Sequence, residues 1–303
     1  MSLLPRSSHS ARNARMCVQQ LIIITIILII IIFNTFPFID YSLQSPSQLL
    51  DMCLQTPIRY SETSAQIGAY YQTSTQHLCA TRVALDLFRR VYATAQLTIY
   101  IDSSSPSASA IIDSGAYSPI SVLSYDSNGT TAKGSRGTYF DTAASCVSYI
   151  KRIVKAAENV DWLILLEDDV WLCNRINTSA LHYDMNGQCI AQYSKAWDNL
   201  LHIPGKNCYG GYGGFVLKAS FLRSMTKMHM EEAINAILKE IKRPVASDEL
   251  LSALLLRANG TIGRIADYKE KMTQEPVIEH QMKAFYHYAY DNDDGLSCTT
   301  DKM

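Results

Sequence analysis

The hydrophobic positions of this chain alternate between short continuous runs, typical of strands, and stretches with helical spacing. The clearest run, Trp162–Leu166, is apolar at every position, which is the pattern of a strand buried on both faces of a sheet. Strands that alternate with helices predict an α/β fold with a largely parallel sheet and right-handed crossovers. The predicted strands cover residues 66–73, 96–101, 120–125 and 162–166, and the predicted helices cover 76–92, 142–159 and 231–243.

Three consecutive carboxylates, Glu167, Asp168 and Asp169, directly follow the central run. The carboxyl edge of a parallel sheet is where α/β folds bind ligands. Adjacent carboxylates repel one another unless a cation lies between them, and oxygen ligands favour a hard ion such as Mg²⁺ or Mn²⁺. An acidic triplet on a solvated loop is the alternative. The position after a buried strand favours a divalent-metal site that carries a diphosphate.

A long apolar segment near the N-terminus predicts a membrane anchor. Residues 16–39 are apolar with few polar interruptions, and about 20 such residues span a bilayer. Arg6, Arg12 and Arg15 precede the segment and no acid occurs before Asp40, so the positive-inside rule places the N-terminus in the cytosol. A cleaved signal peptide is the rival interpretation, but no small-x-small cleavage site follows the apolar core.

This topology predicts a single-pass type II protein of the Golgi or endoplasmic reticulum membrane. Sequons at Asn128, Asn177 and Asn259 all fall in the part predicted to be lumenal, where glycan acceptors belong. The predicted parts are a cytosolic tail at 1–15, a transmembrane signal anchor at 16–39, a stem at 40–63 and a lumenal domain at 64–303.

Cysteine usage and charge narrow the range of partners. The chain has eight cysteines, one of them in the predicted anchor, so an odd number remains for an oxidising lumen. At least one thiol then stays free or pairs between chains, which leaves a disulfide-linked or non-covalent homo-oligomer open. Cys173, Cys189 and Cys208 frame an irregular region and predict a stapled loop over the site. The formal net charge of −1 argues against a nucleic-acid binder.

Two further segments carry candidate ligand contacts. The Gly/Tyr run at 209–217 brings Gly213 and Gly214 to the start of a strand, where the backbone can approach a ligand closely, although a plain turn is the alternative. Near the C-terminus a short apolar strand ends at His280, which could complete a coordination shell, and Lys283 could meet phosphate. A lone histidine is more often structural.

A pair of acids opens a predicted helix after residue 246. Ser247 is a candidate N-cap, which would place Asp248 and Glu249 in the first turn. Acids at this place also complement the helix dipole without any catalytic role, and that is the commoner case.

As an ordered set, these motifs resemble those of GT-A fold glycosyltransferases. The Glu167-Asp168-Asp169 triplet is a variant of that superfamily's DxD motif, and the resemblance covers roughly residues 66–287. The other matching features are the N-terminal anchor, Asp102 at the end of an early strand, the glycine-rich strand entry, the Ser247-Asp248-Glu249 helix start and the late His280. The implied fold is a Rossmann-like, mostly parallel sheet flanked by helices, preceded by one transmembrane helix.

The resemblance also implies residue roles. Asp248 would be the general base of an inverting displacement, with Glu249 as its substitute. The donor side would comprise Tyr70, Gln72 and Asp102 at uracil and ribose, Glu167 at ribose, Asp168 at the donor sugar, Asp169 and His280 at the metal, Lys283 at phosphate, and Gly213 and Gly214 under the donor or acceptor.

The resulting prediction is a metal-dependent glycosyltransferase. It would use Mn²⁺ or Mg²⁺ to neutralise the leaving diphosphate and would transfer a hexosyl or N-acetylhexosaminyl group from a UDP-sugar to a hydroxyl of a glycan, glycolipid or protein. A non-catalytic glycan-binding protein of the same fold and a membrane-tethered glycoside hydrolase with a carboxylate pair are the alternatives. Metal and nucleotide dependence separate these classes.

Overall fold

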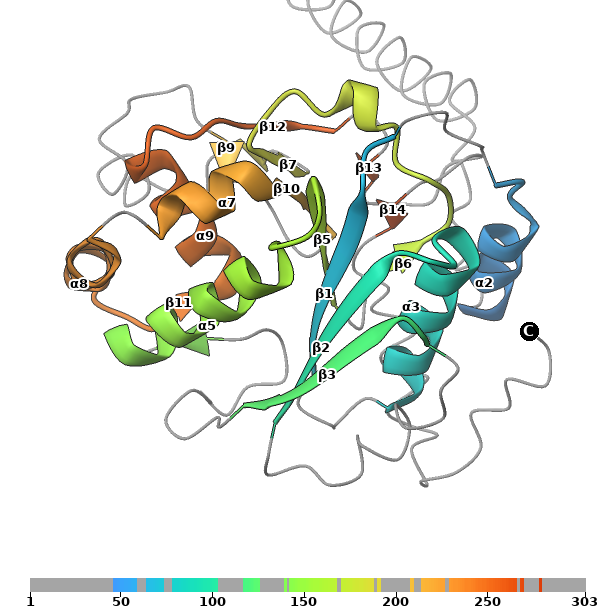
Figure 1. The fold of residues 1–303 in the computed structure, drawn as a ribbon, viewed down its shortest axis with the longest axis horizontal. Coiled ribbons are helices and arrows are strands. Elements are labelled where there is room, and N and C mark those ends of the chain that lie inside the picture. The colour runs from blue at the N-terminus through green and yellow to red at the C-terminus, as the bar shows by residue number, and fades with distance from the viewer. Residues whose placement is uncertain are drawn as a thin grey trace, which may run out of the picture. The chain divides into compact units, whose positions relative to one another are not determined.

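A seven-stranded sheet forms the centre of the fold in the computed structural model (Figure 1). The structure describes residues 46–58, 64–73, 78–102, 117–125, 139–140, 142–167, 170–187, 190–191, 208–209, 214–226, 229–265, 268–269 and 278–279. The strand order is β12-β7-β10-β5-β1-β2-β3. These strands are β1 Ile67–Thr73, β2 Gln96–Asp102, β3 Ile120–Tyr125, β5 Trp162–Leu166, β7 Met185–Gly187, β10 Val216–Lys218 and β12 Ile262–Arg264.

Most neighbouring strands of this sheet run parallel. β5, β1, β2 and β3 form a continuous parallel block, and β12 is parallel to β7. β10 lies antiparallel to both of its neighbours, β5 and β7. The smaller sheets pair β4 Tyr139–Phe140 with β11 Val245–Ala246, β6 Trp171–Leu172 with β14 Ile278–Glu279, β14 with β13 Tyr268–Lys269, and β8 Ile190–Ala191 with β9 Cys208–Tyr209.

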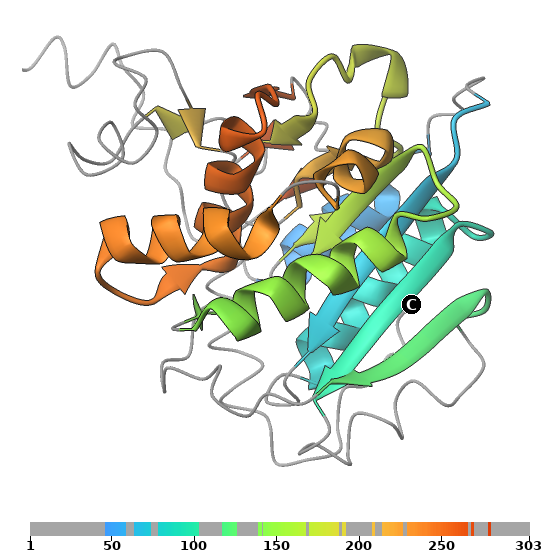
Figure 2. The same cartoon turned by 60° about the vertical axis from the view of Figure 1, so that its left-hand side comes forward.

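Helices cover both faces of the sheet, as Figures 1 and 2 show. They are α2 Pro46–Gln55, α3 Leu78–Val91, α5 Ala143–Ala156, the short 3₁₀-helix η1 Thr178–Ala180, α7 Ala219–Met225, α8 Met230–Ile241 and α9 Ser247–Arg257. The side chains of each strand alternate between the two faces. On β1, Tyr70 joins the core under α5, α7, α8 and α9, whereas Tyr71 joins the core under α3. The central run behaves as predicted, because Leu163 and Ile164 are fully buried on opposite faces.

The elements agree closely with the hydrophobic pattern. The four predicted strands match β1, β2, β3 and β5, and the three predicted helices match α3, α5 and α8 within a few residues. Thr142 caps α5, and its hydroxyl oxygen accepts a hydrogen bond from the Ser145 backbone at 3.2 Å. α8 ends where Lys242 takes a left-handed conformation with a φ of 55°. The prediction of an α/β fold with a mostly parallel sheet is confirmed.

The segment predicted as a stem is partly packed into the domain. Helix α2 carries Cys53, which forms a disulfide with Cys173 just after β6. Arg90 of α3 donates hydrogen bonds to the carbonyl oxygens of Leu54 and Thr56 at 2.6 and 2.7 Å. The folded part therefore includes residues 46–58 and begins before the predicted boundary at 64.

The same disulfide removes Cys173 from the predicted stapled loop, because Cys173 is tied to α2 and not to a cysteine of the region that follows it, and Cys189 lies outside the described residues. The predicted anchor at 16–39 lies outside the described residues. Within the described ranges, no helix is both long and apolar enough to cross a membrane.

Candidate functional site

The strand order changes direction at β1, and this position defines a candidate site. From β1 the sheet continues through β2 and β3 on one side and through β5 on the other, and all four strands are parallel. Ligands of open α/β sheets bind outside the carboxyl ends of the strands at such a switch point. The register pairs Tyr71 with Leu166, so Gln72 and Glu167 lie at the carboxyl ends of adjacent strands.

Gln72 is held at this edge by two hydrogen bonds to one oxygen atom. The Tyr70 hydroxyl donates to Gln72 Oε1 at 2.6 Å, and Arg152 Nη2 donates to the same atom at 3.2 Å. Arg152 is buried, and its guanidinium carbon lies 5.6 Å from the centroid of the Tyr100 ring and 5.9 Å from that of Tyr149. The aromatic faces stabilise a positive charge in a place with little water. The predicted nucleotide residues Tyr70 and Gln72 therefore belong to one cluster with a buried cation.

Tyr149 packs against Tyr70, one of the residues predicted for the donor side. Its ring packs 4.8 Å from that of Phe140 and edge-on at 6.1 Å from that of Tyr70. Burial raises the pKa of Tyr149 well above its ordinary value, and Tyr70, Glu167 and Asp248 raise it further, whereas a hydrogen bond with the Ser247 side chain lowers it. Of the predicted site residues, Tyr70 therefore packs directly against this buried ring, whereas Glu167 and Asp248 act on its hydroxyl through their charges.

The first turn of α9 carries both acids predicted as catalytic, but its cap differs from the prediction. The N-cap is Ala246 and not Ser247, because Ala246 still pairs with Tyr139 as the last residue of β11. Glu249 supplies the missing cap, since its carboxylate accepts a hydrogen bond from the Ala246 backbone at 3.1 Å. The placement of Asp248 and Glu249 in the first turn agrees with the prediction.

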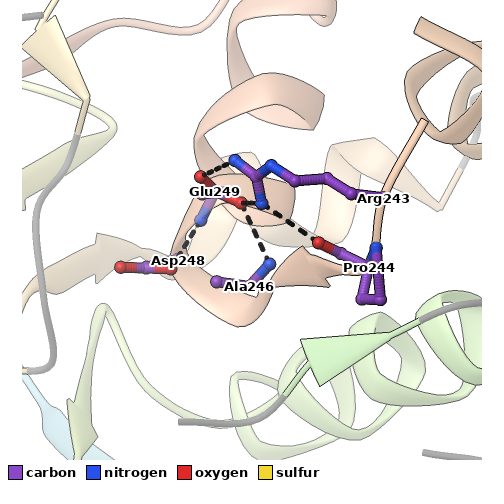
Figure 3. A network of polar contacts seen from close by, with 5 residues as sticks. All are labelled: Arg243, Pro244, Ala246, Asp248 and Glu249. Carbon is purple, nitrogen blue, oxygen red and sulfur yellow. Dashed lines mark hydrogen bonds and ion pairs between the residues drawn. The ribbon is translucent and has the colours of Figure 1, made fainter. Parts of the chain in front are cut away.

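The two acids face different partners (Figure 3). Glu249 forms a two-point ion pair with Arg243, with nitrogen–oxygen distances of 2.7 and 2.9 Å. Asp248 extends to the other side, and its Oδ1 accepts a hydrogen bond from the Glu249 backbone at 2.8 Å. Both oxygens of Glu249 are engaged in holding the helix start, so the geometry favours a structural role for Glu249 and leaves Asp248 as the candidate base.

Gly214 occupies a conformation that favours glycine. Its φ is 84°, and its backbone N–H donates to the Leu165 carbonyl at 2.7 Å near the end of β5. Asp102 is the last residue of β2 and pairs with Tyr125 of β3, so its backbone lies at the same edge of the sheet as Gln72.

The remaining predicted residues lie outside the described ranges: Asp168, Asp169, Gly213, His280 and Lys283. Within those ranges, no group of three or more His, Cys, Asp or Glu side chains is arranged to hold a metal. The backbone near Asp169 and His280 is relevant to the prediction that these two residues hold one metal ion. β14 runs antiparallel to β6, with Glu279 opposite Trp171. The residue before His280 therefore lies across from the residue two positions after Asp169.

Sequence reasoning missed two residues of this site, Tyr149 and Arg152. Both lie on α5 at a spacing of three, which places them on one helix face. The sign available in the sequence was that Arg152 falls on the buried face of the helix, because an arginine is seldom buried without a partner. The partner itself, Gln72, is 80 positions away in the chain and no local pattern reveals it.

Two solved structures of the galactosyltransferase LgtC resemble this chain. The one in complex with donor and acceptor sugar analogues aligns with a TM-score of 0.51 and 9% sequence identity, covering 71% of this chain and 87% of LgtC. This chain therefore shares its overall fold with LgtC. An active-site glutamine-to-glutamate mutant of LgtC aligns with a TM-score of 0.51 and 8% identity over the same shares. At this identity the likeness shows the fold alone. No protein-family profile and no curated protein matches the sequence.

Proposed function

We propose that this protein is a metal-dependent glycosyltransferase that moves a sugar from a UDP-sugar to a hydroxyl of a glycan, glycolipid or protein. The observation that carries the proposal is the switch point at β1, where Gln72 and Glu167 lie at the carboxyl ends of adjacent parallel strands and the Tyr70 hydroxyl holds Gln72. Open α/β sheets bind ligands outside the carboxyl ends of the strands at such a point. The shared fold with LgtC, which was solved with donor and acceptor sugar analogues, supports the same reaction class.

The donor would lie over the carboxyl ends of β1, β2 and β5. Tyr70 and Gln72 are fixed to each other and to Arg152, so they offer a rigid edge for the nucleoside. Glu167 and Asp102 would accept hydrogen bonds from ribose hydroxyls, Asp168 would contact the transferred sugar, and Lys283 would contact phosphate. Gly213 and Gly214 would let the backbone pass close beneath the sugar.

The donor set at the end of β5 fits a hard divalent cation, because it consists of carboxylate oxygens. We assign Asp169 and His280 as the residues that would hold Mn²⁺ or Mg²⁺, and the pairing of Glu279 with Trp171 supports that assignment. When bound, such an ion supplies Lewis-acid stabilisation of the charge that develops on the leaving diphosphate.

Asp248 would take the proton of the acceptor hydroxyl as the bond to the sugar forms. The Glu249 backbone N–H holds one carboxylate oxygen of Asp248, and the side chain is nearly buried, so the base is oriented before the acceptor arrives. A positioned general base contributes about 10²–10⁴-fold to the rate. Direct displacement with this base inverts the anomeric configuration.

We further propose that residues 16–39 anchor the protein in the Golgi or endoplasmic reticulum membrane with this domain in the lumen.

The test is release of UDP by the full chain in detergent, with Mn²⁺ or with chelator, from UDP-GlcNAc, UDP-GalNAc, UDP-Gal, UDP-Glc and GDP-Man. We expect metal-dependent turnover of one donor, its loss in Asp169→Asn, and a fall of about 10²–10⁴-fold in transfer in Asp248→Asn with donor binding retained. Asp161→Asn is the matched control, because Asp161 lies just before the opposite end of β5, where its carboxylate accepts a hydrogen bond from the Gln66 backbone.

Each part of the proposal has its own contrary result. If no nucleotide is released from any donor and calorimetry detects neither UDP nor Mn²⁺ binding, the protein is not a transferase. A glycan-binding role is then the better assignment. Chelator-insensitive cleavage of a glycan without nucleotide would indicate a glycoside hydrolase. A product with retained configuration, measured by NMR, would remove Asp248 from the role of base and leave the transferase assignment standing.

A further inference from the structure

We infer that Arg152 is a positioning residue that fixes the side-chain amide of Gln72 with its nitrogen toward the nucleobase of the UDP-sugar. The amide would then donate a hydrogen bond to the 4-carbonyl oxygen of uracil and discriminate against cytosine. This inference rests on the proposed function. Gln72 lies near the carboxyl end of β1, beside Glu167 at the end of β5, where the UDP-sugar would bind.

The orientation of the Gln72 amide follows from the chemistry of its two neighbours. Its Oε1 accepts hydrogen bonds from the Tyr70 hydroxyl at 2.6 Å and from Arg152 Nη2 at 3.2 Å. A hydroxyl can either donate or accept, so Tyr70 would tolerate both orientations of the amide. A guanidinium has hydrogen-bond donors only, so the amide atom beside Arg152 must be the oxygen. Of these two neighbours, Arg152 therefore decides which end of the amide faces the protein.

The guanidinium of Arg152 is itself held in place. Arg152 is buried, and its Nη1 donates a hydrogen bond to the Ser148 hydroxyl oxygen at 2.8 Å. The guanidinium carbon lies 5.6 Å from the ring centroid of Tyr100 and 5.9 Å from that of Tyr149. Because the group is planar and packs against two rings, it cannot turn away from Gln72 without losing these contacts. The fold, and not a ligand, therefore fixes the position of Nη2 beside the amide.

The amide nitrogen of Gln72 is the part left for a ligand. With Oε1 turned toward Tyr70 and Arg152, this nitrogen presents two N–H groups on the other side of the planar amide. Tyr70 and Arg152 are buried, whereas Gln72 is only half-buried, so the nitrogen lies on the more open side of the cluster. A bound molecule with a hydrogen-bond acceptor at this place would satisfy it.

A fixed N–H group discriminates between pyrimidines only where their hydrogen-bonding groups differ. Uracil carries a carbonyl acceptor at position 4, whereas cytosine carries an amino group that donates. Opposite the Gln72 nitrogen, uracil forms a hydrogen bond and cytosine places two donors against each other. At the 2-carbonyl, which both bases share, the same amide would bind them alike. Because a fixed amide orientation affects base selection only at position 4, we assign the contact to that position.

The experiment measures the dissociation constants of UDP and CDP by calorimetry, on the full chain in detergent with Mn²⁺. We expect the wild type to bind UDP about 10-fold more tightly than CDP, or better, because CDP replaces one hydrogen bond with two opposed donors. In Arg152→Met the amide can exchange its two ends, so the affinities for UDP and CDP should come within about twofold of each other. In Gln72→Glu the carboxylate keeps Arg152 as its partner but only accepts hydrogen bonds, so the preference for UDP should be lost or reversed.

Tyr70→Phe is the matched control. It removes the shorter of the two hydrogen bonds to Gln72 Oε1 but leaves Arg152 in place, so the orientation of the amide stays fixed. The affinities for UDP and CDP should then change together, and their ratio should stay within about twofold of wild type. A general loosening of the site would instead lower the ratio in Tyr70→Phe as much as in Arg152→Met.

Two further variants keep the test independent of folding defects. Arg152→Lys retains a group with hydrogen-bond donors only, so it should keep most of the preference for UDP that Arg152→Met loses. If Arg152→Met does not fold, Gln72→Glu carries the test, because it leaves the buried arginine with a partner.

The results separate the two proposals. A wild type that turns over a UDP-sugar but binds UDP and CDP alike would overturn the positioning role and leave the transferase assignment intact. A folded Arg152→Met or Gln72→Glu variant that keeps the wild-type preference for UDP would do the same. A wild type that binds neither nucleotide and releases none from any sugar donor would overturn the proposed function, and the positioning role with it.

Discussion

Removal of the disulfide between Cys53 and Cys173 tests whether residues 46–58 belong to the folded domain. The bond joins α2 to the end of β6 across 120 positions of sequence, and both cysteines are fully buried beside Trp171 and Leu87. The perturbation is the double variant Cys53→Ala and Cys173→Ala. Alanine avoids placing an unsatisfied hydroxyl in this apolar cluster.

The magnitude follows from the length of the closed loop. For a loop of 120 positions, the chain-entropy expression gives about 16 cal/mol/K, or about 5 kcal/mol at 25 °C. Measured disulfides typically contribute about 2–4 kcal/mol, because the unfolded chain retains some structure. For a domain of this size about 1 kcal/mol corresponds to about 2–4 °C, so the melting temperature should fall by roughly 5–15 °C.

The assay is thermal unfolding followed by tryptophan fluorescence, for which Trp171 in the same cluster is a local probe. Cys146→Ala is the control, since Cys146 is a buried thiol on α5 outside any disulfide. Peptide mapping without reduction should recover Cys53 linked to Cys173. A double variant that melts within about 2 °C of the Cys146→Ala control, or a map that links Cys173 to another cysteine, would refute the assignment of α2 to the domain.

Two further substitutions test the site and the sheet. Glu249→Ala removes the ion pair with Arg243 and the cap on Ala246, so the free energy of unfolding should fall by about 1–2 kcal/mol. The kcat for transfer, measured at low temperature, should stay within about threefold of wild type. A loss of kcat by about 100-fold in a folded variant would make Glu249 the base. Gly68→Ala would bring a Cβ to 2.8 Å from Val160 Cγ1 at the amino end of the sheet, so chemical denaturation should show a loss of about 1–3 kcal/mol, and an unchanged midpoint would contradict the packing.

The fold was predictable because its main signals are local. Burial on both faces requires an apolar residue at every position of a central strand, and Trp162–Leu166 carries that pattern in its own sequence. The helical spacing over residues 142–159 is likewise a local property, and α5 follows it. The order of the strands and the antiparallel direction of β10 were not predictable, since they depend on contacts between distant segments.

The errors arose where a tertiary contact decides the local structure. Residues 46–55 have the composition of a linker, but they form a helix that a disulfide holds to a residue 120 positions away. Ser247 has the chemistry of an N-cap, but the pairing of Ala246 with Tyr139 extends β11 by one residue and shifts the helix start. In both cases the partner lies far away in the chain, and the sequence near the error gives no sign of it.

The two acids at the start of α9 show why residue type alone cannot assign a catalytic role. Successive residues of a helix are rotated by about 100°, so two adjacent carboxylates cannot both face one site. Arg243, just before β11, pairs with Glu249 on one side of the helix start, whereas Asp248 extends to the other side. The ion pair stabilises the turn, whereas the positions of the two acids on the helix determine which of them faces the other side. If Arg243 is replaced by Ala, Glu249 loses its partner but keeps its helix position. The ratio between the rate of sugar transfer to the acceptor and the rate of donor hydrolysis should therefore remain that of the wild type. A fall in that ratio as large as the one expected for Asp248→Asn would mean that the orientation of Asp248 depends on Arg243 and not on the helix alone.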